Sequence, residues 1–307
     1  CIALDKFSDI LNQDVQKQLT EKNAVFVPNR SFEVYINDYD AIENKFIVPM
    51  FGNKKLLRIE ERGFKPNQYD LLDAAKIRYP KQFTDPKDID RLCIVKVLEK
   101  ERGFERAFFL ANSYSEYKMK AQEKIIKGNT TEEQLKKSVI EEFILGVQVN
   151  FNFFYSSLTK KLELLGTDTR RQTNFEGVYK LSSEYQRDFK DAGGRIKYEE
   201  AGHIAVTVLE SMLEQAFEMG ERFVEASKKF VAPGVIGPFG LQSMIIPGPP
   251  KKDIIVFDVS PRVPGSPGIA ATPYSKYLFG EPVSVGRRIA MEIKEAVKLD
   301  RLEEILT

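Results

Sequence analysis

The sequence of 307 residues has no tryptophan, one histidine and two cysteines. Two cysteines are too few for a disulfide framework or a cysteine-ligated zinc site, and a single histidine excludes a metal cluster built from several histidines. Sparse cysteine is typical of proteins of the reducing cytoplasm, so we expect a cytoplasmic protein.

Neither sign of charge is in excess, because 46 lysines and arginines face 45 aspartates and glutamates. This balance gives no reason to expect a nucleic acid or a membrane surface as partner. No apolar run is long enough to span a bilayer, and no signal peptide is visible. The chain opens at Cys1 without an initiator methionine, so we expect part of a natural N-terminus to be missing or unplaced segments to be skipped.

Two common nucleotide-binding motifs are also absent. The sequence contains neither a Walker-type Gly-x-x-x-x-Gly-Lys-Ser/Thr motif nor a dinucleotide Gly-x-Gly-x-x-Gly motif. If the chain binds a nucleotide, another scaffold must hold it.

What is present is a soluble-type composition, 42% hydrophobic and 30% charged, arranged as mixed helix and strand patterns. We expect an α/β (α+β) fold in three segments, 1–76, 77–146 and 147–307. In the first two segments the pattern predicts helices over 6–22, 40–44, 56–75 (interrupted near 63–66), 115–127 and 131–138. It predicts strands over 24–28, 46–52, 92–97, 107–111 and 139–143.

The third segment has a different character. A hairpin is predicted from 147–155 and 161–165, followed by a long amphipathic helix over 209–229. Two further strands, 237–242 and 254–260, precede a Pro/Gly-rich loop over 261–273 and a terminal helix over 287–299. The loop fits a linker and an active-site loop equally well.

The most informative pattern lies in the last predicted strand. Alternation places Asp258 and Ser260 on one face and Phe257 and Val259 on the other, with Arg262 two residues beyond. A carboxylate, a hydroxyl and a guanidinium in a row suit a magnesium ion and the phosphates that it bridges. An edge strand with a solvated polar face fits the same residues.

Two earlier segments suggest nucleotide contacts. Lys96 lies within an apolar strand and precedes a basic loop over 99–106, so it could reach phosphates or simply face solvent. Glu141 and Glu142 end the strand before Gly146, where they are either solvated or part of a hinge whose backbone binds an adenine edge. The lone histidine, His203, is by itself more typical of a structural or surface residue.

Together these segments resemble the ATP-grasp superfamily, in the order of a strand lysine, a flexible basic loop, a Glu-Glu-aromatic hinge and two metal strands ending in Asp-x-Ser-Pro-Arg. More narrowly, almost the whole chain resembles the archaeal PurP family of formate-dependent aminoimidazole carboxamide ribonucleotide ligases. The matching stretches are 48–53, 88–90, 108–111, 140–146, 153–156, 163–166, 210–213, 217–220, 233–243 and 286–290.

The resemblance implies an ATP-grasp fold with a truncated Rossmann-like N-terminal subdomain (1–76), a small ATP-grasp lobe (77–146) and a large lobe with the metal site (147–307). It implies a ligase that uses ATP, formate and Mg²⁺ or Mn²⁺ to formylate the ribonucleotide in purine biosynthesis, acting as a homo-oligomer on small molecules. The implied roles are metal ligation by Gln242 and Asp258, charge stabilisation by Arg262, ATP binding by Lys96, Glu141, Glu142, Phe143, Ile144 and Gln172, and substrate binding by Ser31 and His203.

The chain departs from the family pattern at several of these positions. His203 stands where the family has an asparagine, and Gln172 stands where it has a carboxylate. The phosphate loop is replaced by the charged stretch 99–106, and a Pro-His-Gly-Ser segment reads Pro28-Asn-Arg-Ser31. A paralogue with another carboxylate or amine, or a nucleotide-binding regulatory protein without turnover, are therefore the alternatives.

Overall fold

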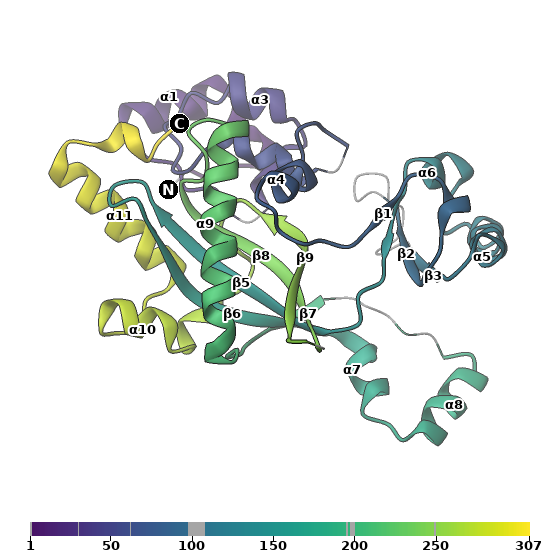
Figure 1. Cartoon of the computed structure of the whole chain (residues 1–307). Helices are drawn as coiled ribbons and strands as arrows, with labels where there is room; N and C mark the ends of the chain where they lie inside the picture. The colour runs from purple at the N-terminus through teal and green to yellow at the C-terminus, as the bar shows by residue number, and fades with distance from the viewer. Residues whose placement is uncertain are drawn as a thin grey trace.

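The structure is a computed structural model, and it describes residues 2–29, 31–61, 63–97, 108–194, 196, 200–248 and 250–307. The basic loop predicted to follow Lys96 lies outside the described residues. Figure 1 shows a larger body around one sheet and, beside it, a smaller sheet with its own helices.

The N-terminal segment is a set of short helices around an aromatic core. It contains the 3-10 helices η1 (Phe7–Leu11) and η2 (Lys54–Glu60) and the α-helices α1 (Gln13–Glu21), α2 (Phe32–Ile36), α3 (Tyr39–Asn44) and α4 (Gln68–Ala74). Phe32 and Phe46 are fully buried in its core. The predicted helices are therefore present, with the expected break before α4.

The two strands predicted in this segment, 24–28 and 46–52, are wrong. They meet only at one parallel bridge, Phe26 with Met50. There the Phe26 N–H donates to the Pro49 carbonyl, and the Phe51 N–H donates to the Phe26 carbonyl. The next bonds of a parallel ladder would need N–H donors at Pro28 and Pro49, which proline lacks. Two prolines thus limit the pairing to a single step.

The smaller sheet confirms the strands predicted for the middle segment. Its order is β1-β4-β2-β3, and every pair is antiparallel. The bounds are β1 (Gln82–Phe83), β2 (Cys93–Lys96), β3 (Phe108–Ala111) and β4 (Val139–Glu142), with the 3-10 helix η3 (Pro86–Asp88) and the helices α5 (Tyr114–Ile126) and α6 (Glu132–Lys136). Its core buries Cys93, Val95 and Ile140 against α5 and α6.

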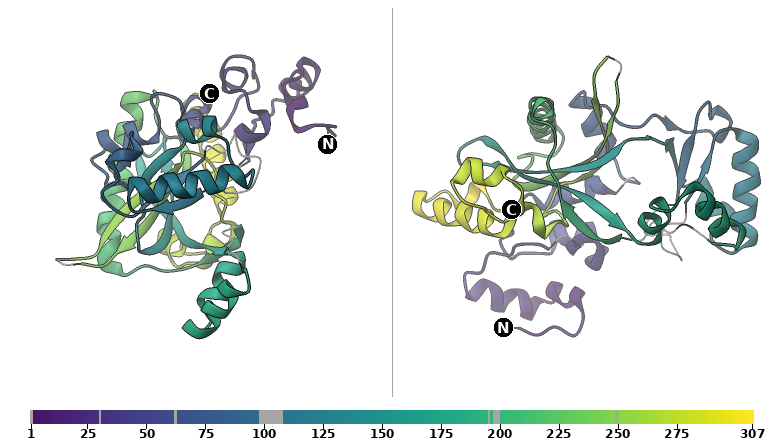
Figure 2. Two further views of the ribbon diagram at one scale, coloured as in Figure 1. Left: turned by 90° about the vertical axis from the view of Figure 1, so that its right-hand side faces the viewer. Right: turned by 90° about the horizontal axis from the view of Figure 1, so that it is seen from below.

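The larger sheet holds five antiparallel strands in the order β7-β6-β5-β8-β9. They are β5 (Val147–Ser156), β6 (Lys161–Gln172), β7 (Glu200–Ala205), β8 (Gly237–Ile246) and β9 (Asp253–Ser260). The short 3-10 helix η5 (Glu210–Met212) leads into the long helix α9 (Leu213–Phe230). Helix α9 packs with α4 on one face of the sheet, while α1, α2 and α3 lie toward the other (Figure 2).

Alternation along the strands separates the two faces of this sheet. On β5, Val149, Phe151 and Phe153 join the core under α9, whereas Asn150 and Asn152 face the opposite side. Both asparagines are nevertheless buried. The sheet therefore has one apolar face and one face with buried polar side chains, and that second face carries the site described below.

The pairing of β8 with β9 confirms that the two predicted metal strands are adjacent, with Gln242 opposite Asp258. A register shift next to this pair makes Ser243 face Val256, so Phe257 is an extra, bulged residue. Val256 and Val259 both enter the core, whereas Phe257 does not. The prediction that Phe257 and Val259 share one face of the strand is therefore wrong. The bulge leaves the predicted placement of Asp258 and Ser260 on the polar side intact.

The C-terminal part covers the far end of the sheet. It comprises the 3-10 helix η6 (Pro267–Ala271), the helices α10 (Tyr274–Phe279) and α11 (Val285–Leu299), and the 3-10 helix η7 (Leu302–Glu304). The predicted terminal helix is confirmed as α11. Arg288 of α11 is buried and pairs with Glu163 and Glu292 beneath the ring of Phe154.

Between β6 and β7 lies an arm that the residue pattern does not predict. Helices α7 (Thr173–Tyr179) and α8 (Ser183–Asp191) project away from the larger body (Figure 1). None of the described side chains of α8 is buried, so no apolar stripe toward a core marks it in the sequence.

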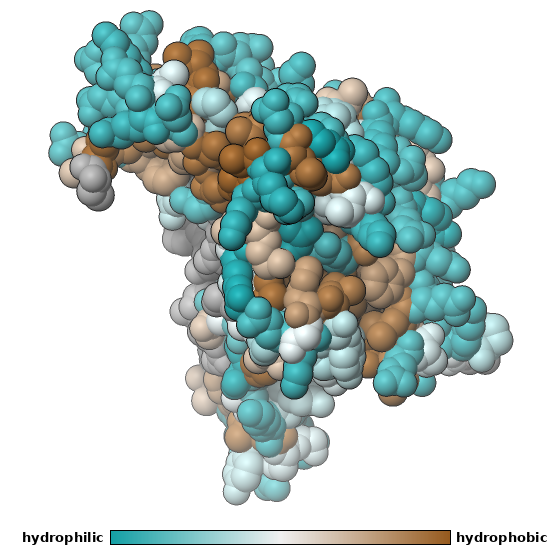
Figure 3. All heavy atoms as spheres, turned by 90° about the vertical axis from the view of Figure 1, so that its left-hand side faces the viewer, coloured by the Kyte–Doolittle hydropathy of each residue, from teal (hydrophilic) through white to brown (hydrophobic). Residues whose placement is uncertain are grey.

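No helix among the described residues is long and apolar enough to cross a membrane. The face of the molecule that Figure 3 shows is largely hydrophilic, with apolar side chains in patches.

Candidate functional site

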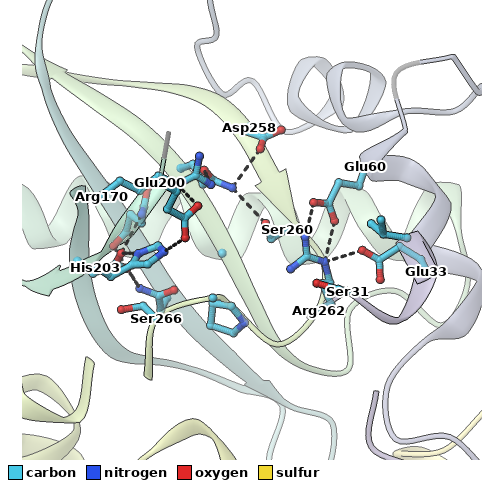
Figure 4. A pocket seen from close by; sticks show the side chains of 18 of the residues that line it. Ser31, Glu33, Glu60, Arg170, Glu200, His203, Asp258, Ser260, Arg262 and Ser266 are labelled. Carbon is cyan, nitrogen blue, oxygen red and sulfur yellow. Dashed lines mark hydrogen bonds and ion pairs between the residues drawn. The ribbon is translucent and has the colours of Figure 1, made fainter. Parts of the chain in front are cut away.

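A cavity of about 520 Å³ lies between the N-terminal segment and the polar face of the larger sheet. Its lining comes from α2 and η2 on one side, from β5 to β9 on the other, and from the loop after β9 (Figure 4). The lining residues are Ser31, Glu33, Val34, Asn37, Tyr39, Glu60, Glu61, Asn150, Asn152, Asp168, Arg170, Glu200, His203, Gly240, Gln242, Asp258, Ser260, Arg262, Pro264, Gly265 and Ser266.

The β8–β9 edge brings Gln242, Asp258 and Ser260 together in this cavity. The Gln242 amide nitrogen donates to Asp258 Oδ2 at 3.0 Å and to Ser260 Oγ at 3.2 Å. The Gln242 amide oxygen accepts from Arg170 Nη2 at 2.8 Å. Arg170 of β6 is thus hydrogen-bonded directly to Gln242, one of the two predicted metal ligands.

This edge fits a magnesium ion only in a limited sense. The described residues contain no group of three or more His, Cys, Asp and Glu side chains that could hold a metal on their own. Magnesium, however, is commonly held by one or two protein oxygens together with substrate phosphates and water. Asp258 and Ser260 can supply such oxygens, and Gln242 can do so once its amide oxygen turns away from Arg170.

Arg262 lies at the junction between the sheet and the N-terminal segment. Its guanidinium donates to Glu33 Oε1 at 2.9 Å and to the Glu60 carboxylate at 2.6 and 3.0 Å. Burial raises the pKa of both Glu33 and Glu60, and the Arg262 charge opposes that rise. The arginine predicted to stabilise charge in the reaction is therefore already hydrogen-bonded to two carboxylates of the protein.

His203 of β7 stands in the opposite wall, between two carboxylates. Its Nδ1 is 2.5 Å from Asp168 Oδ2, and its Nε2 is 2.9 Å from Glu200 Oε1. Asp168 is 1% exposed and also accepts hydrogen bonds from Asn150 and Asn152. The hydrogen bond to Asp168 raises the pKa of His203, and Glu200 adds to the rise. His203 is therefore held in place and favoured as the imidazolium.

The cavity wall contains most of the unsatisfied polar atoms among the described residues. Buried atoms without a hydrogen-bond partner include Glu33 Oε2, Asn150 Oδ1, Arg170 Nε and Ser266 Oγ, and all four residues line the cavity. Leaving such atoms unpaired costs on the order of 1–3 kcal/mol each. Their concentration here indicates a site shaped for a polar ligand.

The predicted site residues, with one exception, fall into two groups. Ser31, His203, Gln242, Asp258 and Arg262 line the cavity. Residues Lys96 and Glu141 to Ile144 belong to the smaller sheet and its exit and do not line it.

Within the second group, Lys96 forms an ion pair with the buried carboxylate of Glu141, which also accepts from the Tyr69 hydroxyl at 3.1 Å. Glu142 Oε1 lies 3.6 Å from Arg91 Nη1 near the surface. The remaining predicted residue, Gln172, belongs to neither group: it ends β6 of the larger sheet, donates its backbone N–H to Glu176 and does not line the cavity.

Sequence reasoning missed several cavity residues, above all Asp168, Arg170 and Glu200. The predicted strand stopped at 165, whereas β6 continues to Gln172. A usable signal was present in Val149-Asn-Phe-Asn-Phe153, where polar and apolar residues alternate and place two asparagines on one face. The same alternation places Asp168 and Arg170 beside them through the β5–β6 register, in which Asn150 faces Asp168.

Comparisons with known proteins agree with this architecture. A family model described as "Domain of unknown function (DUF1297)" matches residues 116–307, and one described as "Protein of unknown function (DUF1246)" matches residues 1–83. A protein of Methanothermobacter thermautotrophicus named 5-formaminoimidazole-4-carboxamide-1-(beta)-D-ribofuranosyl 5'-monophosphate synthetase is 40% identical over 100% of this chain and 82% of the relative. The protein of the same name from Methanocaldococcus jannaschii is 39% identical over the same shares.

The crystal structure of an IMP biosynthesis protein PurP from Thermococcus kodakaraensis superposes with a TM-score of 0.72 at 27% identity, covering 100% of this chain and 85% of that one. The chain belongs to the PurP family.

The PurP family has the ATP-grasp fold, as expected from the motif order. The same fold is seen in the biotin carboxylase domain of the Hydrogenobacter thermophilus 2-oxoglutarate carboxylase, with a TM-score of 0.59 at 11% identity over 95% of this chain and 58% of that one. At that identity the likeness concerns the fold alone. PurP membership thus accounts for the fold with its two sheets.

Proposed function

We propose that this chain is an ATP-dependent ligase that forms a C–N bond between formate and the 5-amino group of aminoimidazole carboxamide ribonucleotide, in purine biosynthesis. The observation that carries the proposal is one cavity that joins the Gln242–Asp258 edge to Ser31 and His203 in a member of the PurP family. Its volume of about 520 Å³ suits small-molecule substrates.

ATP is proposed to extend from the smaller sheet to the β8–β9 edge. Lys96 would contact its phosphates, and residues 141–144 would contact its adenine as a hinge between the small lobe (77–146) and the large lobe (147–307). The ion pair with Glu141 supports the assignment of Lys96, because it fixes a flexible cation on the inner strand β2. Gln172 is proposed to reach the same nucleotide from the end of β6.

The reaction proceeds in two transfers. A formate oxygen attacks the γ-phosphorus of ATP, the bond to ADP breaks, and formyl phosphate forms. The amino nitrogen then attacks the formyl carbon, the bond from carbon to the phosphate oxygen breaks, and the nitrogen loses a proton as phosphate leaves. Water must be kept from the acyl phosphate during this interval, because it would hydrolyse the intermediate.

A magnesium or manganese ion would be held at Asp258, with Gln242 and Ser260 beside it, and would offset the charge of the phosphates. Asp258 is the residue of this edge that supplies an anionic oxygen. Arg262 is proposed to act by positioning, because its contacts with Glu33 and Glu60 fix the end of β9 against the N-terminal segment.

The ribonucleotide is proposed to lie against Ser31, which precedes α2, and His203 of β7, which lie on opposite sides of the cavity (Figure 4). His203 can offer a charged donor where the family has a neutral asparagine. Because two carboxylates hold this histidine in place, the change from asparagine also favours the second candidate function, that of a paralogue with another amine or carboxylate substrate.

The direct experiment measures phosphate release from ATP with formate and the ribonucleotide present, and with each omitted in turn. Release that requires both supports the formyl ligase. Phosphate release that requires the ribonucleotide and a different carboxylate identifies the paralogue. Binding of the nucleotide without any phosphate release contradicts the proposal that the protein is an enzyme. Action in the cytoplasm as a homo-oligomer completes the proposal, and light scattering of the purified protein tests the assembly.

A further inference from the structure

The cavity is lined by two arginines whose guanidinium groups differ in how fully they are hydrogen-bonded. Arg262 donates three hydrogen bonds to the carboxylates of Glu33 and Glu60. Arg170 donates from Nη2 to the Gln242 amide oxygen, while its Nε is buried and has no hydrogen-bond partner. A buried guanidinium N–H without an acceptor is costly, so the Arg170 edge is the part of the wall best prepared for an incoming anion.

A carboxylate of the protein already lies at this edge. Glu200 Oε2 is 3.7 Å from Arg170 Nε, too far for a hydrogen bond, while Glu200 Oε1 is 2.9 Å from His203 Nε2. One carboxylate thus faces a guanidinium and an imidazole at once, and of these two it is hydrogen-bonded to the imidazole. Glu200 begins β7, directly after residues that the structure does not describe.

We propose that Arg170 and His203 form the binding site for a small carboxylate, and that Glu200 occupies this site when no substrate is bound. The carboxylate would accept from Arg170 Nε and from His203 Nε2, which are the atoms that Glu200 now faces. His203 would then border both this site and the ribonucleotide. If the proposed function holds, on which this assignment rests, the carboxylate is formate. Arg170 is then a residue that binds a substrate, whereas the resemblance gave it no role and gave Arg262 the stabilisation of charge.

The position of Arg170 explains why a carboxylate is favoured over the phosphate of the ribonucleotide. The Arg170 side chain is hydrogen-bonded to Gln242, and the Gln242 side chain is hydrogen-bonded to Asp258 and Ser260. A carboxylate on Arg170 therefore lies next to the edge where the γ-phosphate is proposed to be held, as attack on that phosphorus requires. A guanidinium also matches the two oxygens of a carboxylate in its planar geometry.

The neighbouring Arg171 provides a matched control. It lies on the same strand but does not line the cavity, and its Nε pairs with Glu176 of α7 at 2.7 Å. Arg171→Gln removes the same charge from the same strand without touching the proposed carboxylate site.

The test is saturation-transfer NMR on the single C–H proton of formate, with and without a non-hydrolysable ATP analogue and magnesium. We expect transfer with the wild-type protein and with Arg171→Gln, and loss of transfer with Arg170→Gln. Glu200→Gln should increase formate affinity because the competing carboxylate is gone. In turnover assays Arg170→Gln should raise the KM for formate about tenfold to a hundredfold, with little change in the KM for the ribonucleotide.

Equal transfer from Arg170→Gln and wild type would overturn the proposal, as would no transfer with the wild type in either condition. If saturating ribonucleotide removes the formate signal, the site holds its phosphate instead and the assignment to formate is wrong. Should Arg170→Gln fail to fold, Arg170→Lys and Glu200→Gln carry the same test. Phosphate release is measured separately, so an inactive wild type that still binds formate through Arg170 contradicts the proposed function and leaves this site standing.

Discussion

The two walls of the cavity differ in how completely their charges are paired (Figure 4). In the wall toward the N-terminal segment, Arg262 is hydrogen-bonded to Glu33 and Glu60. In the wall built by β6 and β7, Arg170 Nε has no hydrogen-bond partner and faces Glu200 at 3.7 Å, and His203 is held between Asp168 and Glu200. A guanidinium that is already hydrogen-bonded to carboxylates holds parts of a protein together, whereas an unsatisfied donor is available to a ligand. We therefore assign the Arg262 cluster to architecture and the wall that contains Arg170 and His203 to chemistry.

The largest expected effect is at the edge between the two walls. Asp258→Asn should lower kcat by at least about a hundredfold, because removing the anionic oxygen weakens charge stabilisation during phosphoryl transfer. Steady-state phosphate release measures it, with the melting temperature as a check on folding. Asp253→Asn is the matched control, since Asp253 lies on the same strand and pairs with Arg78 outside the cavity. Near wild-type turnover by Asp258→Asn would contradict the site.

Loss of Arg262 should mainly lower stability. Arg262→Ala leaves Glu33 and Glu60 without their cation, and breaking a buried pair in this way costs about 3–5 kcal/mol. Urea denaturation measures the free energy of unfolding. Arg78→Ala, which breaks an exposed pair, should cost about 1 kcal/mol or less. An Arg262→Ala protein of unchanged stability but without turnover would place Arg262 in the reaction instead.

A smaller effect is expected in the smaller sheet. Lys96→Ala should weaken ATP binding about tenfold and leave ribonucleotide binding nearly unchanged, because one charge-assisted contact to phosphate is lost. Calorimetric titration of each ligand measures this difference. Lys81→Ala is a suitable control, because Lys81 pairs with Asp90 at the surface. Equal losses for both ligands would mean that Lys96 is only structural.

The subtlest effect concerns pH. The raised pKa of His203, caused by Asp168 and then Glu200, stabilises the fold below the ordinary histidine pKa, and that stabilisation is lost as the pH rises through the raised value. The groups that face the ring are Asp168, Glu200 and, beyond Glu200, Arg170. His203→Asn should therefore lose more stability relative to wild type at about pH 6 than at about pH 9. If the loss of stability in His203→Asn is the same at both pH values, His203 does not stabilise the fold through its charged form.

Much of the fold was accessible from the sequence where a pattern had a single physical meaning. The strands β2, β3, β4, β8 and β9 and the helices α5, α9 and α11 follow from periodicity and terminal signals. The wrong strands at 24–28 and 46–52 satisfied the same apolar rule, but Pro28 and Pro49 blocked the ladder on either side of Phe26. The bulge at Phe257 left no mark in the residue pattern.

For the site, the sequence indicated residues but not their partners. The resemblance named Gln242, Asp258 and His203, and all three line one cavity. Arg170 and Glu200 could not be found in this way, because they lie on strands whose extent was not predicted and because their importance depends on contacts across strands. The engagement of Arg262 by Glu33 and Glu60 joins residues more than two hundred positions apart, which only the fold reveals.

The most direct test of the central claim follows oxygen from formate. With formate labelled with ¹⁸O, attack on the γ-phosphorus transfers one formate oxygen to the phosphate that is finally released, and the other stays in the formamide. Mass spectrometry of the phosphate from a complete reaction measures this transfer. We expect one ¹⁸O atom in each released phosphate. Unlabelled phosphate, formed while the ribonucleotide is formylated, would contradict the formyl phosphate route.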